Sequence, residues 1–257
     1  QYLAGPGNPP LALVHTDADI VWRYDFREEL GVFPHNATSS SALVVGDAVF
    51  VSTSNGVDWG HLAMPAPMAP ALVALDRKTG ALLGEESSGI SARTLHSNWS
   101  SPALAMVKKQ PVVLFGGGDG FLYGFDPKPR LDKEGLAVFK ELFRYDGNAP
   151  RYRKGKDGKP IRYPAAEGPS EYIATPVFHE GRVYVAIGQD PEHGNGVGRL
   201  SAIDPSKRGN LGNKAVWTYD GIGRSISTVS IDGGVLYVAE YSGKLHAVDV
   251  KNGKPLW

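Results

Sequence analysis

The feature that most constrains this chain is a strand ending that returns four times along its 257 residues. Each copy is a strand of alternating apolar residues that runs into an aspartate, at Asp76, Asp126, Asp204 and Asp249. After the first and the last of these comes a turn with glycine, in which a carboxylate caps backbone N–H groups and glycine adopts a positive φ. We therefore interpret the four aspartates as structural residues.

Further strands accompany each ending. Upstream lie two apolar strands, joined in three copies by Gly-Asp, Glu-Gly or Gly-Gly, which are hairpin signals. A fourth strand carries the pattern aromatic-x-Tyr-Asp. Four antiparallel strands that recur at intervals of roughly 40 or more residues predict the blades of a β-propeller. The first strand of each blade is headed by a small hydroxyl residue, at Ser41, Ser101, Thr175 and Thr228.

The sequence thus predicts an all-β fold, with residues 1–257 forming a single, partial β-propeller domain. The four-stranded blades are expected at residues 25–84, 85–143, 170–217 and 223–257. Residues 20–25 are expected to form the outer strand of a preceding or closing blade. Because open end blades would present unpaired strand edges, we expect either further blades in a longer protein or a self-association that closes the ring.

The pattern Leu-x-Ala-x-Asp-x-x-Thr/Asn-Gly followed by Trp resembles the repeat of PQQ-like, or quinoprotein-type, β-propellers, and the resemblance covers nearly the whole chain from Ile20. This superfamily includes the BamB-like outer-membrane assembly lipoproteins and the quinoprotein dehydrogenases. Residues 31–36, 53–58 and 188–194 look most like bacterial members of planctomycete type. The resemblance implies a ring of seven or eight blades, of which four are present, and a periplasmic or exported location.

Composition excludes several classes of function. Lys plus Arg and Asp plus Glu are balanced at 27 each, so no overall field attracts nucleic acid or an anionic membrane. No apolar run approaches the ~18–20 residues of a transmembrane segment. With no cysteine, the chain has no disulfide, thiolate metal ligand, iron–sulfur cluster or cysteine nucleophile.

Three excursions depart from the repeat. Two blades carry longer hairpins, the first insert (residues 54–71) and the second insert (residues 189–196). A link (residues 147–169) joins the second blade to the third. In a four-stranded antiparallel blade these connections emerge at the same end, so they should decorate one face around the channel mouth. Function is expected on this loop-bearing face, because binding residues concentrate on loops that a rigid scaffold positions.

The two inserts contain candidate metal ligands. Carboxylates with asparagine suit Ca²⁺, and added histidine suits Zn²⁺ or another transition metal. Alternatively, the carboxylates cap backbone N–H groups within tight, glycine-rich loops. The candidates are Asp58, His61, Asp190, Glu192 and His193.

A second set of candidates precedes the inner strands or follows a short hairpin at the same mouth. An acid, a base and aromatic rings together suit a polar aromatic cofactor, whereas the alternative is a water-filled, hydrogen-bonded channel. These candidate ligand-binding residues are His96, Trp99, Glu171, Tyr172, Arg224 and Glu240.

Three functions follow. The first is a non-catalytic binding or scaffold propeller of an exported bacterial protein, which presents its loop-bearing face to a protein, a glycan or a small ligand. The resemblance implies an alternative, a fragment of an alcohol or sugar dehydrogenase that holds PQQ and Ca²⁺, although the chain lacks the adjacent cysteine pair of many such alcohol dehydrogenases. The third, a metal-dependent hydrolase, requires Asp58, Glu192 and His193 to converge. No catalytic residue is assigned.

Overall fold

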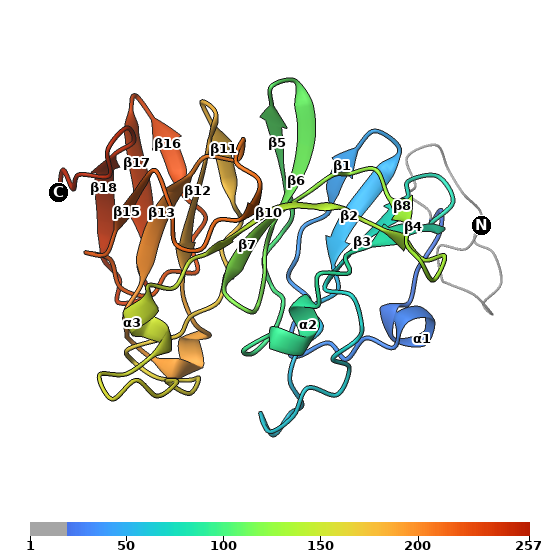
Figure 1. The fold of residues 1–257 in the computed structure, drawn as a ribbon, viewed down its shortest axis with the longest axis horizontal. Helices are drawn as coiled ribbons and strands as arrows, with labels where there is room; N and C mark the ends of the chain where they lie inside the picture. Colours follow the sequence, from blue (N-terminus) through green and yellow to red (C-terminus); the bar gives the residue numbers. More distant parts are fainter. Residues whose placement is uncertain (1–19) are drawn as a thin grey trace, which may run out of the picture.

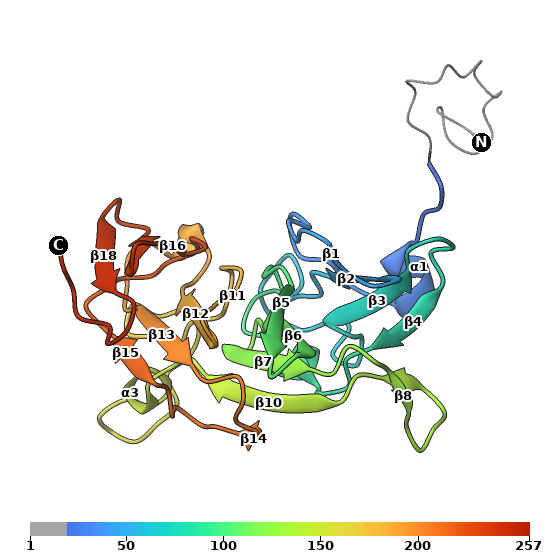
Figure 2. The same ribbon diagram turned by 90° about the horizontal axis from the view of Figure 1, so that it is seen from above.

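The computed structural model describes residues 20–257, which form four β-sheets that follow one another in chain order across the molecule (Figures 1 and 2). Within each sheet, strands that are consecutive in a blade pair antiparallel. This arrangement confirms the predicted all-β propeller architecture. The ring of seven or eight blades stays a prediction.

The strands of each sheet are as follows. The first sheet contains β1 (Leu43–Val45), β2 (Ala48–Ser52), β3 (Leu72–Asp76) and β4 (Leu82–Glu85). The second contains β5 (Ala103–Val107), β6 (Gln110–Gly116), β7 (Phe121–Phe125) and β10 (Glu141–Asp146). The third contains β11 (Val177–His179), β12 (Arg182–Ile187), β13 (Arg199–Ile203) and β15 (Trp217–Tyr219), and the fourth β16 (Ser230–Asp232), β17 (Val235–Ala239) and β18 (Leu245–Asp249).

Helices in the described part of the chain are short. They are α1 (Phe26–Leu30), α2 (Ile90–Arg93), α3 (Pro150–Arg153) and the 3₁₀ helix η1 (Pro191–His193). None of the helices in residues 20–257 has the length and apolar character needed to cross a membrane.

Two connections reach back to the preceding blade. The hairpin of β8 (Arg130–Leu131) and β9 (Ala137–Val138) pairs with the outer edge of the first sheet, where β9 runs parallel to β4. In the same way, β14 (Gly209–Asn210) runs parallel to β10 at the outer edge of the second sheet. Each connection covers strand edges that would otherwise be unpaired.

Apolar side chains between successive blades form three core clusters. The first joins β2 and β3 to β6 and β7, with Phe50, Leu72 and Phe115 fully buried. The second joins the second blade to the third, and the third joins the third blade to the fourth. The blades are therefore held together mainly by burial of apolar surface between neighbouring sheets.

The recurring hydroxyl residues connect neighbouring blades. The Ser101 hydroxyl accepts a hydrogen bond from the backbone N–H of Ser41 at 2.9 Å, and Thr228 accepts one from the N–H of Thr175 at 3.3 Å. A backbone N–H of one inner strand is thus satisfied by the corresponding side chain of the next blade. This contact accounts for the hydroxyl groups of Ser101 and Thr228.

The repeat aspartates have the predicted structural role. Asp76 accepts hydrogen bonds from the backbone of Lys78 and Thr79, and Asp249 accepts them from Lys251 and Asn252. Indole rings pack on two of these turns. Trp22 donates to the carbonyl of Arg77 and lies against Gly80, where a Cβ would approach the ring to 2.7 Å. Trp217 likewise donates to Val250 and lies against Gly253.

Residues 20–25 form no strand in the structure, contrary to expectation. The outer strand of a blade pairs with the third strand of the same blade, and no such strand lies beside these residues in the described part of the chain. Trp22 nevertheless packs on the first blade as Trp217 of the third blade packs on the fourth. Asp25 ends the segment as the N-cap of α1.

Candidate functional site

The three excursions meet at the end of the sheets that points downward in Figure 1. At their centre is His96, which lies between α2 and β5 on the approach to the second blade. His61 of the first insert, Tyr163 of the link and His193 of the second insert all contact it, with ring centroids 4.7, 6.0 and 5.3 Å from that of His96. The predicted loop-bearing face is therefore a single packed assembly.

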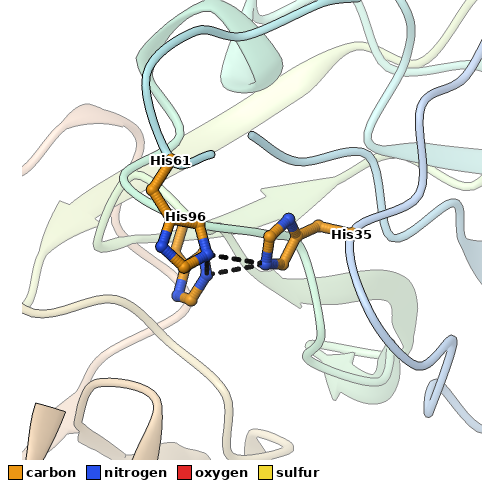
Figure 3. A group of neighbouring side chains, drawn as sticks. All are labelled: His35, His61 and His96. Atoms are coloured by element: carbon orange, nitrogen blue, oxygen red, sulfur yellow. Dashed lines mark hydrogen bonds between the residues drawn. The ribbon is translucent and has the colours of Figure 1, made fainter. Parts of the chain in front are cut away.

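Three histidines of this assembly point their Nε2 atoms at one another (Figure 3). We call His35, His61 and His96 the histidine cluster. The Nε2–Nε2 distances are 2.9 Å for His96–His35, 3.2 Å for His61–His35 and 3.3 Å for His96–His61. His35 and His96 are buried, whereas His61 is exposed. The cluster thus opens to solvent on the side of His61.

The geometry of the histidine cluster matches a metal site. Imidazole nitrogens that bind one tetrahedral Zn²⁺ ion at ~2.05 Å lie about 3.3 Å apart, close to the observed spacings. Three imidazoles without thiolate ligands suit Zn²⁺, Cu²⁺, Ni²⁺ or iron. His35, His61 and His96 can therefore supply three nitrogen ligands to one metal ion.

Hydrogen bonds at the other ring nitrogens favour the ligand tautomer. Nδ1 of His35 lies 2.7 Å from the carbonyl oxygen of Val57, so it donates its proton there and leaves a lone pair on Nε2. Nδ1 of His96 lies 3.3 Å from the Tyr163 hydroxyl. This hydroxyl donates its own proton to Glu171 at 3.1 Å, so its oxygen accepts from His96. The Nε2 lone pairs of His35 and His96 then face each other, with the two nitrogen atoms 2.9 Å apart. A cation bound between them stabilises this arrangement.

Burial keeps His96 neutral. Desolvation, with a further contribution from the nearby His35, lowers the pKa of His96 from 6.5 to about 4, although Asp190 opposes the shift. A neutral imidazole is the form that binds a metal ion. Trp99 contributes to this burial, since its ring meets His96 edge-on at 4.9 Å and its indole N–H donates to the carbonyl of His35.

Glu171 anchors the far end of this hydrogen-bond chain. Its carboxyl group is fully buried and accepts hydrogen bonds from Tyr163 and from the backbone N–H of Ser97. Burial raises the pKa of Glu171 well above its usual value, while both hydrogen bonds act to lower it. The chain from Glu171 through Tyr163 to His96 has the form of the outer-shell hydrogen bonding that orients metal-ligating histidines.

Backbone packing holds the first insert against the histidines. Gly56 pairs with Ser97, and a Cβ at Gly56 would lie 2.7 Å from both the Cβ of His35 and the carbonyl oxygen of His96. Glycine is needed here because no larger residue permits this approach. The buried side chain of Asn55 adds hydrogen bonds to the N–H of Phe33 and the carbonyl of Ala66.

The five candidate metal ligands from the sequence do not form one group. His61 belongs to the histidine cluster, and the half-buried His193 lies beside it. Asp58 instead caps its own loop by accepting from the N–H groups of Leu62 and Ala63, which lower its pKa. Asp190 caps η1 through the N–H of Glu192, and Glu192 is exposed. Both aspartates therefore cap backbone N–H groups, as the alternative interpretation expected. Among the described residues, Asp58, Glu192 and His193 do not converge as a hydrolase site would require.

The second candidate set is also divided. His96, Trp99 and Glu171 build the site, but Tyr172 does not line it. Tyr172 is fully buried in the core cluster between the second and third blades, because Glu171 forms an extended bridge with Gly188 and neighbouring residues of an extended segment face opposite sides.

Arg224 and Glu240 have other partners. The Arg224 guanidinium donates to the carbonyl oxygens of Ala165, His193 and Gly194, and so ties the link to the second insert. Glu240 accepts from the N–H of Gly223, from the hydroxyl of Ser242 and from His246, and these bonds lower its pKa to about 2 against the opposing effect of burial. Glu240 and Arg224 both line a separate cavity of about 480 Å³ beside the fourth blade.

His35 is the ligand that sequence reasoning missed. It precedes the inner strand of the first blade, as His96 precedes that of the second, but it lies six residues before the hydroxyl position Ser41, whereas His96 lies five before Ser101. A search for histidines ahead of all inner strands, without a fixed spacing, would have paired His35 with His96.

Comparisons with known proteins agree with the fold. A family model described as outer membrane protein assembly factor BamB matches residues 156–257. No curated protein matches the chain by sequence. None of the comparisons bears on the expected similarity to planctomycete-type proteins, which stays a prediction.

Solved structures give the same picture. BamB from Moraxella catarrhalis is similar with a TM-score of 0.56 and 17% identity, over 86% of this chain and 52% of that one. A quinohemoprotein alcohol dehydrogenase from Comamonas testosteroni gives 0.52 and 17%, over 84% and 40%. Sqt1 from Saccharomyces cerevisiae gives 0.55 and 12%, over 88% and 50%. The chain therefore spans about half, or less, of each of these proteins, and the similarity shows the propeller fold.

Proposed function

We propose that this chain, a PQQ-like β-propeller repeat protein, is a binding propeller that holds a transition-metal ion, with Zn²⁺ as the first candidate, on His35, His61 and His96. The observation that carries this proposal is the convergence of three Nε2 atoms within 2.9–3.3 Å. The Nδ1 hydrogen bonds of His35 and His96 support it, because they free the two buried Nε2 lone pairs for a cation.

The wider role that we propose is a scaffold of an exported or periplasmic protein, with a protein as its partner. Support comes from the family model that matches residues 156–257, which is described as outer membrane protein assembly factor BamB. The loop-bearing face is the surface for such a partner, since the exposed Trp59 and Leu62 lie on the first insert beside His61.

The described residues do not fit PQQ with Ca²⁺ at this face. Ca²⁺ takes six to eight oxygen ligands, whereas the converging donors here are three imidazole nitrogens. The acid and the arginine that an anionic quinone site would use are already engaged: Glu171 with Ser97 and Tyr163, and Arg224 with backbone carbonyls. The quinone-dependent dehydrogenase therefore receives no support from this site.

Zinc titration tests the proposal. Tag-free protein, stripped with a chelator, is titrated with Zn²⁺ against a chromophoric competitor, and we expect one tightly bound equivalent. Structural Zn²⁺ sites release about 10–16 kcal/mol through four ligands, or about 3 kcal/mol per ligand, so His35→Ala or His96→Ala should each weaken affinity by roughly a hundredfold or more. His179→Ala, which removes a histidine outside the cluster, should bind as the wild type does. Equal zinc affinity in all four proteins would refute the proposal.

A substitution at Tyr163 tests the outer hydrogen-bond chain. Tyr163→Phe removes the acceptor for Nδ1–H of His96 while all three imidazoles remain. Loss of an outer-shell partner costs about ten- to hundredfold in metal affinity, and we expect a decrease in that range. Tyr241→Phe, at an exposed tyrosine on the fourth blade, is the matched control. Unchanged zinc affinity in Tyr163→Phe, with the protein folded, would show that this chain does not orient the ligand.

A further inference from the structure

We infer that the metal ion proposed for the histidine cluster keeps one exchangeable position, which takes a small anion or carboxylate, and that His193 hydrogen-bonds this ligand. The inference rests on the proposed function and extends it from a bound ion to a ligand-binding centre. Three independent features of the site carry it: the charge of the donor set, the side on which the cluster is open, and the unpartnered nitrogen of His193.

The donor set leaves both charge and coordination incomplete. Three neutral imidazoles bound to a divalent ion carry a net charge of +2, and within residues 20–257 no carboxylate belongs to the group of converging donors. Tetrahedral zinc sites with three protein ligands hold water or another exchangeable ligand in the fourth position. An anion in that position offsets the charge, whereas a fourth neutral donor does not.

Access to the cluster is open on the side of His61. Trp99 and Glu171 are buried, and they close the cluster toward the blades. His61 is exposed on the opposite side, and the neighbouring Trp59 is 64% exposed with its ring 5.6 Å from that of His35. An external ligand can therefore approach the ion past the first insert, along the exposed indole ring of Trp59.

His193 supplies an unused hydrogen-bonding group beside this opening. Its ring lies 5.3 Å from that of His96 and meets Tyr163 edge-on at 5.1 Å. Its Nδ1 is enclosed, but it has no hydrogen-bond partner in the described residues, and such an unsatisfied buried group is costly. Arg224 fixes the backbone of His193 through its carbonyl, so the ring is held in place next to the cluster. A ligand on the metal would supply the missing partner.

Cobalt substitution with azide as the probe tests this inference. Co²⁺ replaces Zn²⁺ in the stripped protein, and its visible d–d bands report the ligand set. We expect azide, and more weakly acetate, to change the spectrum saturably. A hydrogen bond to a charged group contributes about 1.5–3 kcal/mol, so His193→Ala, compared with the wild type at saturating Co²⁺, should weaken azide binding by roughly ten- to a hundredfold. Glu192→Ala, which alters the exposed neighbour, should bind azide as the wild type does.

The two proposals fail in different ways. If Co²⁺ does not bind, or binds equally well to His96→Ala, the metal site itself is wrong and the inference falls with it. If Co²⁺ binds through the cluster but its spectrum is insensitive to azide and acetate, the metal site stands and the exchangeable position is refuted. If azide binds with equal affinity to wild type and His193→Ala, the role of His193 is refuted.

Discussion

Replacing Arg224 by alanine should lower the free energy of unfolding by about 3 kcal/mol, because it leaves three partly buried carbonyl oxygens without donors. The guanidinium is almost fully buried and donates to the carbonyls of Ala165, His193 and Gly194. Each unsatisfied buried acceptor costs about 1–3 kcal/mol, and water that enters the vacated space recovers part of this. Chemical denaturation of the two proteins measures the difference.

The same substitution should also weaken metal binding, because Arg224 ties the link to the second insert and so holds Tyr163 and His193 beside the cluster. Arg208→Ala is the matched control, since Arg208 also donates to two backbone carbonyls but is exposed, and surface substitutions of this kind change stability by less than about 0.5 kcal/mol. Equal destabilisation by both changes would show that the Arg224 contacts are not an anchor.

The sequence predicted those parts of the fold that repeat. The aspartate turns and the register of the hydroxyl residues each depend on a residue type that returns at a fixed position. These sequence patterns predict structure well because each contact involves only one side chain and the backbone next to it. The β8–β9 hairpin and β14 carry no comparable signal, since their pairing depends on edges of the preceding sheet that are distant in sequence.

The candidate site was predicted in location but not in composition. Loop length alone indicated which face would be irregular. Which side chains meet there depends on the angle between blades, which brings together His35, His61 and His96 from positions far apart in the chain. The alternation of side chains in extended chain was the signal that should have separated Glu171 from Tyr172, since neighbouring residues of an extended segment face opposite sides.

Asp58 and Asp190 were poor candidates for metal ligands for a physical reason. In glycine-rich loops the nearest unsatisfied groups are backbone N–H donors, and Asp58 and Asp190 are consumed by them. Histidine side chains cap the backbone N–H groups of their own loop less readily than aspartates do. In glycine-rich loops of this kind, a histidine is therefore a better indicator of a metal site built from several loops than an aspartate is.

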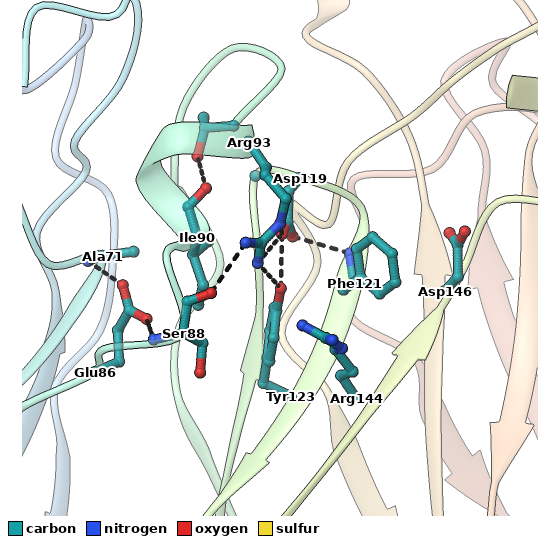
Figure 4. A network of polar contacts seen from close by, with 12 residues as sticks. Ala71, Glu86, Ser88, Ile90, Arg93, Asp119, Phe121, Tyr123, Arg144 and Asp146 are labelled. Atoms are coloured by element: carbon teal, nitrogen blue, oxygen red, sulfur yellow. Dashed lines mark hydrogen bonds and ion pairs between the residues drawn. The ribbon is translucent and has the colours of Figure 1, made fainter. Parts of the chain in front are cut away.

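A second large effect is expected in the pH dependence of stability, through Glu86 at the base of the first insert (Figure 4). Glu86 is buried and accepts hydrogen bonds from the N–H of Ala71, where the insert returns to β3, and from the N–H of Ser88, which follows β4. Burial raises the pKa of Glu86 from 4.5 to about 7, against the lowering effect of these two hydrogen bonds.

The direction of the effect follows from this shift. Between pH 4.5 and about 7 the folded protein keeps a proton that the unfolded chain has lost. The contribution of Glu86 to stability is thus fully present below pH 4.5 and is lost as pH rises through about 7. At about 1.4 kcal/mol per pKa unit, the loss is about 3 kcal/mol.

Denaturation of wild type and Glu86→Gln across this range isolates the contribution. The variant loses one hydrogen bond at every pH, because an amide nitrogen then faces an N–H group, so the slope with pH is the informative quantity and not the absolute stability. We expect the wild type to lose about 3 kcal/mol relative to Glu86→Gln as pH rises from 4.5 to 8. Glu134→Gln removes the same charge from the exposed β8–β9 turn and should keep the wild-type slope. Parallel slopes for wild type and Glu86→Gln would mean that Glu86 is ionised in the folded protein throughout, with its two N–H donors outweighing burial.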